Sequence, residues 1–143
     1  MSQEYNLQRF VDAQERVADA VTRELRDGAK RSHWMWFVFP QVKGLGRSPT
    51  AQHYAIASLE EAKAYLEHPV LGTRLRAWTE ILLGLEEGSA EQIFGYPDYL
   101  KFRSSMTLFS RVPGAPDLFQ RALDKYYDGK PDQATLRILD LSG

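Results

Sequence analysis

Apolar residues recur every three or four positions over most of this chain, which is the spacing of amphipathic helices. We expect one long helix over residues 7–27, with Asn6 as its N-cap and Gly28 as its end. The pattern predicts further helices over 51–57, 59–67, 70–83, 97–109, 116–128 and from 131 onward, with a shorter turn over 89–95. Alternation typical of a half-buried strand is absent over any useful length. The chain is therefore predicted to be all-α or mainly α, a compact multi-helix fold.

Local signals mark several of the expected helix ends. Ser58 stands three residues before Glu61, and Ser89 stands three residues before Gln92, as in a helix-starting capping box. Pro116 suits the first position of a helix. Residues 42–50 are rich in glycine and proline and are predicted to form a loop.

The segment Trp34–Phe39 concentrates more apolar area than any other part of the chain. It is apolar on every side, so we expect it to be buried on both faces as a short, partly helical segment. Pro40 disfavours a helical conformation for Phe39, so the segment should end there. Two interpretations stay open: the aromatic rings are all core, or one tryptophan remains at a pocket wall and stacks on a planar ring.

Composition narrows the class of protein. A chain of 143 residues is expected to form a single domain over 1–143 with one core. A formal net charge of −1 and a pI near 6.3 argue against a dedicated nucleic-acid surface. The chain has no cysteine, so thiol chemistry and disulfides are excluded. Its polar N-terminus predicts neither a signal peptide nor a membrane partner, and we expect a cytoplasmic location.

A cationic group precedes the aromatic segment and is the first part of a candidate ligand site. Lys30 and Arg31 offer charge to a phosphate or carboxylate, and Ser32 offers a hydroxyl. Histidine is the residue type that usually titrates near neutral pH, so His33 is a candidate for proton transfer. The alternative is that these cations interact favourably with the negative end of the first helix's dipole, and that the histidine is a packed, hydrogen-bonded residue.

A glycine-containing loop follows the aromatic segment. Gly44 and Gly46 would let backbone amides approach an anion, with Gln41 and Ser48 as hydrogen-bonding neighbours. The spacing matches neither the dinucleotide-binding fingerprint nor a P-loop. An ordinary loop is the simpler interpretation of this weak signal.

A third group of polar residues lies in the helix expected after Pro97. Asp98, Lys101 and Ser105 share one helical face, and Ser104 and Thr107 add further hydroxyls. Such a set suits sugar or phosphate oxygens. Equally, Asp98 is placed to cap the helix while the serines form a small-residue packing seam.

Six stretches of the sequence together form a specific pattern that covers nearly the whole chain. They are Lys30–Gln41, Gly44–Ser48, Tyr54-Ala55-Ile56, Glu61-Ala62, His68-Pro69-Val70-Leu71-Gly72-x-Arg74-Leu75 and Asp98-x-x-Lys101-x-x-Ser104-Ser105-Met106-Thr107-Leu108-Phe109. This pattern resembles the DUF1810 family of small bacterial proteins. The resemblance implies a compact, mainly helical single domain and brings no established activity.

A shorter segment, Thr50-Ala51-Gln52-His53-Tyr54, is similar to a Thr-x-Glu-His-Tyr segment of the NADAR proteins. Those proteins act on ADP-ribose attached through an N-glycosidic bond. Gln52 stands where that family has glutamate, and an amide cannot act as a general acid or base. The likeness therefore implies binding without that chemistry.

These observations support two hypotheses. In the first, the protein binds an anionic small molecule such as a nucleotide or an ADP-ribose-like compound where residues 30–48 meet residues 98–107. Cations would hold the charge, Trp34 or Trp36 would stack, Tyr54 would belong to the site, and hydroxyls would bond oxygens. A hydrolytic version would use His33 or Asp98 for proton transfer. The alternative is a non-catalytic interaction module that docks through an apolar patch. No metal-ligand spacing and no cofactor motif occurs.

Overall fold

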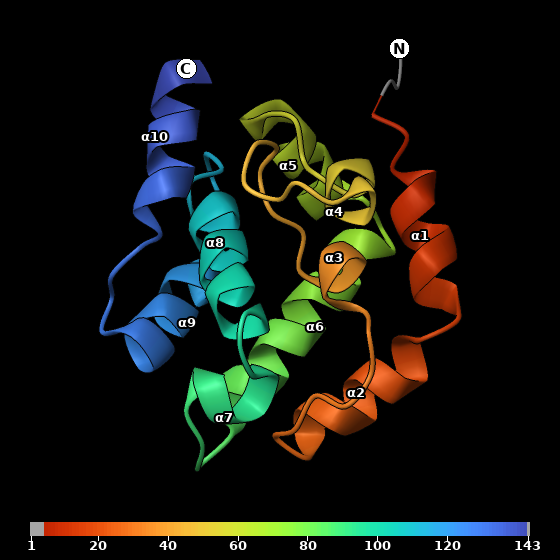
Figure 1. The fold of residues 1–143 in the computed structure, drawn as a ribbon, viewed down its shortest axis with the longest axis vertical. Coiled ribbons are helices and arrows are strands. Elements are labelled where there is room, and N and C mark those ends of the chain that lie inside the picture. The colour runs from red at the N-terminus through yellow and green to blue at the C-terminus, as the bar shows by residue number, and fades with distance from the viewer. Residues whose placement is uncertain (1–4, 143) are drawn as a thin grey trace.

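The computed structural model describes residues 5–142, which form ten helices and one isolated parallel β-bridge between Val42 and Ile56 (Figure 1). The fold is mainly α, as predicted. The helices are α1 (Gln8–Glu15), α2 (Ala18–Arg26), α3 (Met35–Val38), α4 (Pro49–His53), α5 (Leu59–Glu67), α6 (Leu71–Gly84), α7 (Ala90–Phe94), α8 (Asp98–Ser110), α9 (Leu118–Tyr127) and α10 (Gln133–Ser142).

Helices α6 and α8 run through the middle of the molecule, and the others pack around them (Figure 1). Helix α6 contacts α2, α5 and α9, whereas α8 contacts α5, α7, α9 and α10. One continuous hydrophobic cluster fills the space between them. Phe39, Phe94 and Phe102 meet at its centre, with ring centroids 4.9 to 6.1 Å apart. Such aromatic contacts bury large apolar areas and therefore dominate the stability of the core.

The expectation of one helix over residues 7–27 is wrong, because the chain breaks at Arg16 and Val17. No proline or glycine causes the break, and the apolar spacing continues through it. Helix α1 packs on α3 whereas α2 packs on α6, so the two helices bury their apolar faces against different partners (Figure 1). One straight helix would leave one of these faces in water, so tertiary packing overrides the local pattern.

Other helix ends agree with the local signals more closely. The Ser58 hydroxyl accepts from the Glu61 amide at the start of α5, and Ser89 and Gln92 form a full capping box before α7. Gly28 has a positive φ of 67° just after α2 and ends it, as predicted. Two assignments are corrected. Asn6 does not cap α1 with its side chain, and Pro116 lies two residues before α9.

The aromatic segment is only partly buried, in contrast to the expectation of burial on both faces. It forms the single helical turn α3 and ends at Phe39 in a non-helical conformation (φ −127°, ψ 76°), as Pro40 requires. Trp34, Met35 and Val38 point into the core, whereas Trp36 and Phe37 are partly exposed. Because α3 lies at the surface beside α1, its outer side faces solvent.

The loop after α3 returns to the core through a short pairing. Ile56 donates its amide to the Gln41 carbonyl (2.9 Å), and Lys43 donates to the Ile56 carbonyl (2.8 Å). The helix expected over 51–57 instead begins at Pro49 and ends at His53, because Ser48 caps it and Ile56 is needed in this bridge. None of the helices within residues 5–142 is long and apolar enough to cross a membrane.

Candidate functional site

A buried carboxylate, Glu24, fixes the cationic segment and the first tryptophan. Glu24 accepts hydrogen bonds from the amides of Arg31 (2.8 Å) and Ser32 (3.1 Å), the Ser32 hydroxyl (2.5 Å) and the Trp34 indole (2.9 Å). Burial by itself would raise the pKa of Glu24, but these four hydrogen bonds outweigh it and lower the pKa to about 2. Glu24 therefore holds Trp34 inside the protein and fixes the partly exposed Ser32.

The cationic segment meets the start of α8, as the first hypothesis requires. Lys30 Nζ lies 2.8 Å from Asp98 Oδ2, and Lys101 Nζ lies 3.6 Å from Asp98 Oδ1. Lys30 also lies over the ring of Trp34 (5.1 Å), and Lys101 lies over that of Trp36 (5.3 Å). Asp98 thus binds two lysines, which leaves it committed to ion pairs.

The other two members of the segment face solvent. Arg31 is 58% exposed and pairs with Asp27, four positions earlier, at 3.1 Å. His33 is exposed, and its side chain makes no hydrogen bond or ion pair with residues 5–142. Neither side chain lies in a cleft described below.

The hydroxyls of α8 serve its packing. Ser104 donates to the Leu100 carbonyl (3.1 Å), and the buried Ser105 hydroxyl has no hydrogen-bond partner within the described chain. Thr107 donates to the Arg103 carbonyl (2.8 Å) and accepts from the Asp132 amide (2.9 Å). Thr107 therefore joins α8 to the start of α10.

Replacing Thr107 with valine is expected to lower the free energy of unfolding by about 1–2 kcal/mol, because the Asp132 amide loses its acceptor. Urea unfolding followed by circular dichroism measures this change. Thr107→Ser keeps the acceptor and should lower the free energy of unfolding by less than Thr107→Val does. A Thr107→Val protein as stable as the parent would contradict the structural role.

The glycine loop lies mostly in solvent. Gly44 has a φ of 109°, which favours glycine, and a Cβ atom on Gly46 would lie 2.5 Å from the Ala51 side chain. The Ser48 hydroxyl accepts from the Ala51 amide (3.1 Å), and Gln41 contributes its carbonyl to the bridge with Ile56. These residues shape the turn that leads to α4.

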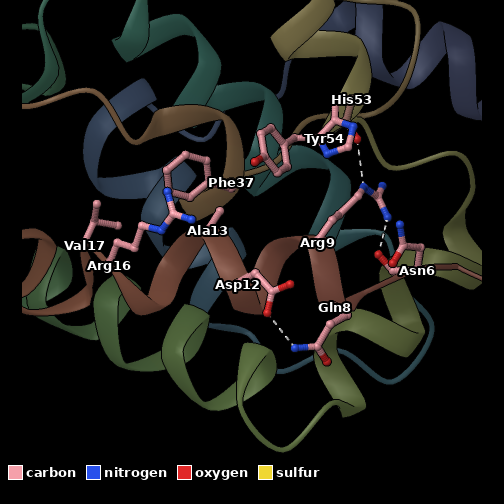
Figure 2. A pocket seen from close by; sticks show the side chains of 10 residues that line it. All are labelled: Asn6, Gln8, Arg9, Asp12, Ala13, Arg16, Val17, Phe37, His53 and Tyr54. Atoms are coloured by element: carbon pink, nitrogen blue, oxygen red, sulfur yellow. Dashed lines mark hydrogen bonds between the residues drawn. The ribbon is translucent and has the colours of Figure 1, made fainter.

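A cleft near the aromatic segment lies between α1 on one side and α3 with the end of α4 on the other (Figure 2). Its volume is about 540 Å³. A neighbouring hollow of about 530 Å³ shares three of its residues and extends it to Trp36. We call the two together the α1–α4 cleft. Its lining residues are Asn6, Gln8, Arg9, Asp12, Ala13, Arg16, Val17, Trp36, Phe37, Pro49, Thr50, His53 and Tyr54.

Two polar residues of α1, the partly buried Arg9 and the buried Gln14, hold the walls of this cleft together. Arg9 donates to the carbonyls of His53 (2.8 Å) and Ala55 (2.9 Å) and pairs with Glu61 (3.1 Å). Gln14 donates to the Phe37 carbonyl (2.7 Å) and to the Tyr65 hydroxyl (3.0 Å). Both walls are therefore anchored to the same helix.

The cleft exposes aromatic rings and one cation that has no partner in the described chain. Phe37 and Tyr54 are partly exposed, with centroids 5.2 Å apart and ring planes at 58°. His53 contacts Tyr54 at 4.6 Å. Arg16 is exposed and makes no hydrogen bond or ion pair with any described residue, and it lines the same cleft as Phe37 (Figure 2).

Of the residues proposed from the sequence, the structure brings Trp36 and Tyr54 together in this cleft. No residue of 98–107 lines it. Sequence reasoning missed Arg9, Asp12 and Arg16, which lie at helical spacing on one side of α1. Charged residues at that spacing are usually solvent-facing, so the sequence carried little signal for them.

Comparison with known proteins supports the family suggested by the sequence motifs. The profile of the family described as "Protein of unknown function (DUF1810)" matches residues 4–139. The chain therefore belongs to the DUF1810 family.

A solved structure is also closely similar. It is the crystal structure of the conserved hypothetical protein Rv1873 from Mycobacterium tuberculosis, with 52% sequence identity and a TM-score of 0.93. The match covers 95% of this chain and 97% of that one. No curated protein matches the chain. The likeness to the NADAR proteins stays a prediction.

Proposed function

We propose that this protein binds an anionic small molecule with a planar ring, such as a nucleotide or an ADP-ribose-like compound, in the α1–α4 cleft. The observation that carries the proposal is Arg16, a cation without a protein partner in the described chain, which lines the same cleft as the partly exposed rings of Phe37 and Tyr54. A volume of about 540 Å³ suits a ligand of this size.

The charge balance of the cleft supports a role for Arg16 in particular. Arg9 also lines the cleft, but its charge is matched by Glu61 and its nitrogens donate to backbone carbonyls. Arg16 keeps its planar fork of donors for a phosphate or carboxylate oxygen.

The aromatic residues support the planar part of the ligand. Because Phe37 and Tyr54 are inclined at 58°, a ligand ring would stack on one of them rather than between them. Trp36 offers a further ring in the adjoining hollow, with Lys101 over it. The proposal is one of binding, since neither His33 nor Asp98 lines the cleft.

Arg16→Ala is expected to weaken binding of AMP, ADP or ADP-ribose about tenfold or more, since a charge-assisted contact is lost. Isothermal titration calorimetry measures this change, and a thermal-shift screen identifies the best of the three compounds beforehand. Arg137→Ala, which removes an exposed side chain of α10, is the matched control and should bind as the parent does. The proposal fails if none of these anions binds the parent protein, or if Arg16→Ala binds equally well.

The interaction-module alternative receives less support. It requires a contiguous exposed apolar patch, and the exposed large apolar side chains of the described chain are Tyr96 (77%) and Leu100 (39%). Two side chains cover less area than the several hundred Å² typical of an interaction patch.

A further inference from the structure

The α1–α4 cleft contains an acidic side chain, Asp12, which an anion-binding site would be expected to exclude. Asp12, in α1, stands four positions before Arg16, which caps the C-terminal end of that helix, and both line the cleft. Residues at this spacing often form an ion pair, yet none connects these two within residues 5–142. The carboxylate and the guanidinium therefore face the cleft as separate groups.

A neighbouring amide fixes the orientation of Asp12. Gln8 Nε2 donates to Asp12 Oδ1 at 2.8 Å, and Gln8 also lines the cleft. The hydrogen bond drawn in Figure 2 reaches one carboxylate oxygen, and the second oxygen bonds no residue of the described chain, so it stays available as an acceptor. An ionised carboxylate only accepts hydrogen bonds, so its partner in a ligand must be a hydroxyl or an N–H group.

The two charges of α1 thus require a ligand with two different parts. One part is anionic and suits Arg16. The other is neutral, carries donors and suits Asp12, since a phosphate placed there would be repelled. Asp12 and Arg16 are four positions apart, which is about 6 Å along a helix axis. A pentose carries its ring hydroxyls and its 5′-phosphate on opposite sides of one small ring, so a single sugar phosphate can reach both groups.

We propose that Asp12, oriented by Gln8, binds a sugar hydroxyl, and that the ligand class of the cleft is a ribose 5′-phosphate carrying a planar base. This inference rests on the proposed function. Arg16 binds the phosphate, Asp12 accepts from the 2′- or 3′-hydroxyl, and the base lies over Phe37 or Tyr54. A carboxylate that accepts from a ribose hydroxyl is a recurrent device in nucleotide recognition.

The experiment compares AMP with 2′,3′-dideoxy-AMP by isothermal titration calorimetry. The parent protein should bind AMP about tenfold more tightly, because the dideoxy compound leaves the Asp12 oxygen without a donor. Asp12→Ala should bind both compounds with the same affinity, near that of the parent for dideoxy-AMP. Asp12 is exposed, so the variant is expected to fold, and circular dichroism checks this.

The chain offers a matched control for this variant. In α9, Gln120 Nε2 donates to Asp124 Oδ1 at 3.0 Å with the same four-residue spacing, away from the cleft. Asp124→Ala should therefore keep the tenfold preference for AMP.

Three results would overturn the inference, and the first two are distinguishable from failure of the proposed function. Equal binding of AMP and dideoxy-AMP by the parent removes the role of the hydroxyls while nucleotide binding stands. Retained preference in Asp12→Ala, or tighter binding of AMP by this variant, removes the role of the carboxylate. If AMP, ADP and ADP-ribose all fail to bind the parent protein, the proposed function is overturned and the inference with it.

Discussion

Replacing Glu24 with alanine is expected to lower the free energy of unfolding by about 4 kcal/mol. The carboxylate of Glu24 accepts four hydrogen bonds, among them one from the fully buried Trp34 indole. Alanine removes the acceptor and leaves buried donors unsatisfied, and each such group costs about 1–3 kcal/mol. Urea unfolding monitored by tryptophan fluorescence measures the change. A loss below about 1 kcal/mol would contradict the structural role of Glu24.

The pH dependence of stability provides the control for this role. The pKa of Glu24 is about 2 in the folded protein against an ordinary value of 4.5, so its folded pKa is depressed. Its contribution is therefore complete above pH 4.5 and is lost as the pH falls towards 2. Glu24→Gln keeps one acceptor oxygen and does not titrate. Its stability should fall less steeply than that of the parent over this range, and identical acid limbs would contradict the assignment.

Local interactions explain which parts of the fold the sequence revealed. The starts of α5 and α7 depend on a serine and a residue three positions later, so the sequence itself contains both partners. Gly28 ends α2 through its own backbone conformation. By contrast, the break after α1 depends on α3 and α6, which are distant in the sequence, and no local signal marks it.

The candidate site was less predictable for the same physical reason. The sequence indicated that the cationic segment meets α8, and Lys30 does pair with Asp98. It could not distinguish Trp34, which Glu24 holds in the core, from Trp36, which is partly exposed. The choice depends on a carboxylate ten positions earlier in a helix full of charged residues, where burial of one glutamate leaves no pattern.

The cleft itself depends on contacts over longer distances. Arg9 and Glu61 are 52 positions apart, and Gln14 is 23 positions from the carbonyl of Phe37 that it holds. The sequence predicts Glu61 as part of a capping box, but the partners of Arg9 and Gln14 lie too far along the chain for a local pattern to reveal. Their contacts depend on the packing of α1 against α3 and α5.

Arg9→Ala is expected to lower the free energy of unfolding by about 3–4 kcal/mol and to abolish ligand binding in the α1–α4 cleft. Arg9 is the partner of Glu61, whose side chain is 4% exposed, and removing one partner of a buried ion pair leaves the other charge unpaired. The same guanidinium donates to the carbonyls of His53 and Ala55, so its loss also frees the wall that carries Tyr54. Urea unfolding and calorimetry with AMP measure the two effects.

Two variants of the same helix separate these effects. Arg9→Lys keeps a positive charge near Glu61 but cannot reproduce the planar fork that bonds two carbonyls and the carboxylate together, so we expect an intermediate loss of stability. Arg16→Ala removes an exposed side chain and should leave stability within about 0.5 kcal/mol of the parent while weakening binding. If Arg9→Ala instead unfolds like the parent, the wall of the cleft is held by other contacts. If Arg16→Ala is less stable than Arg9→Ala, the roles assigned to the two arginines are reversed.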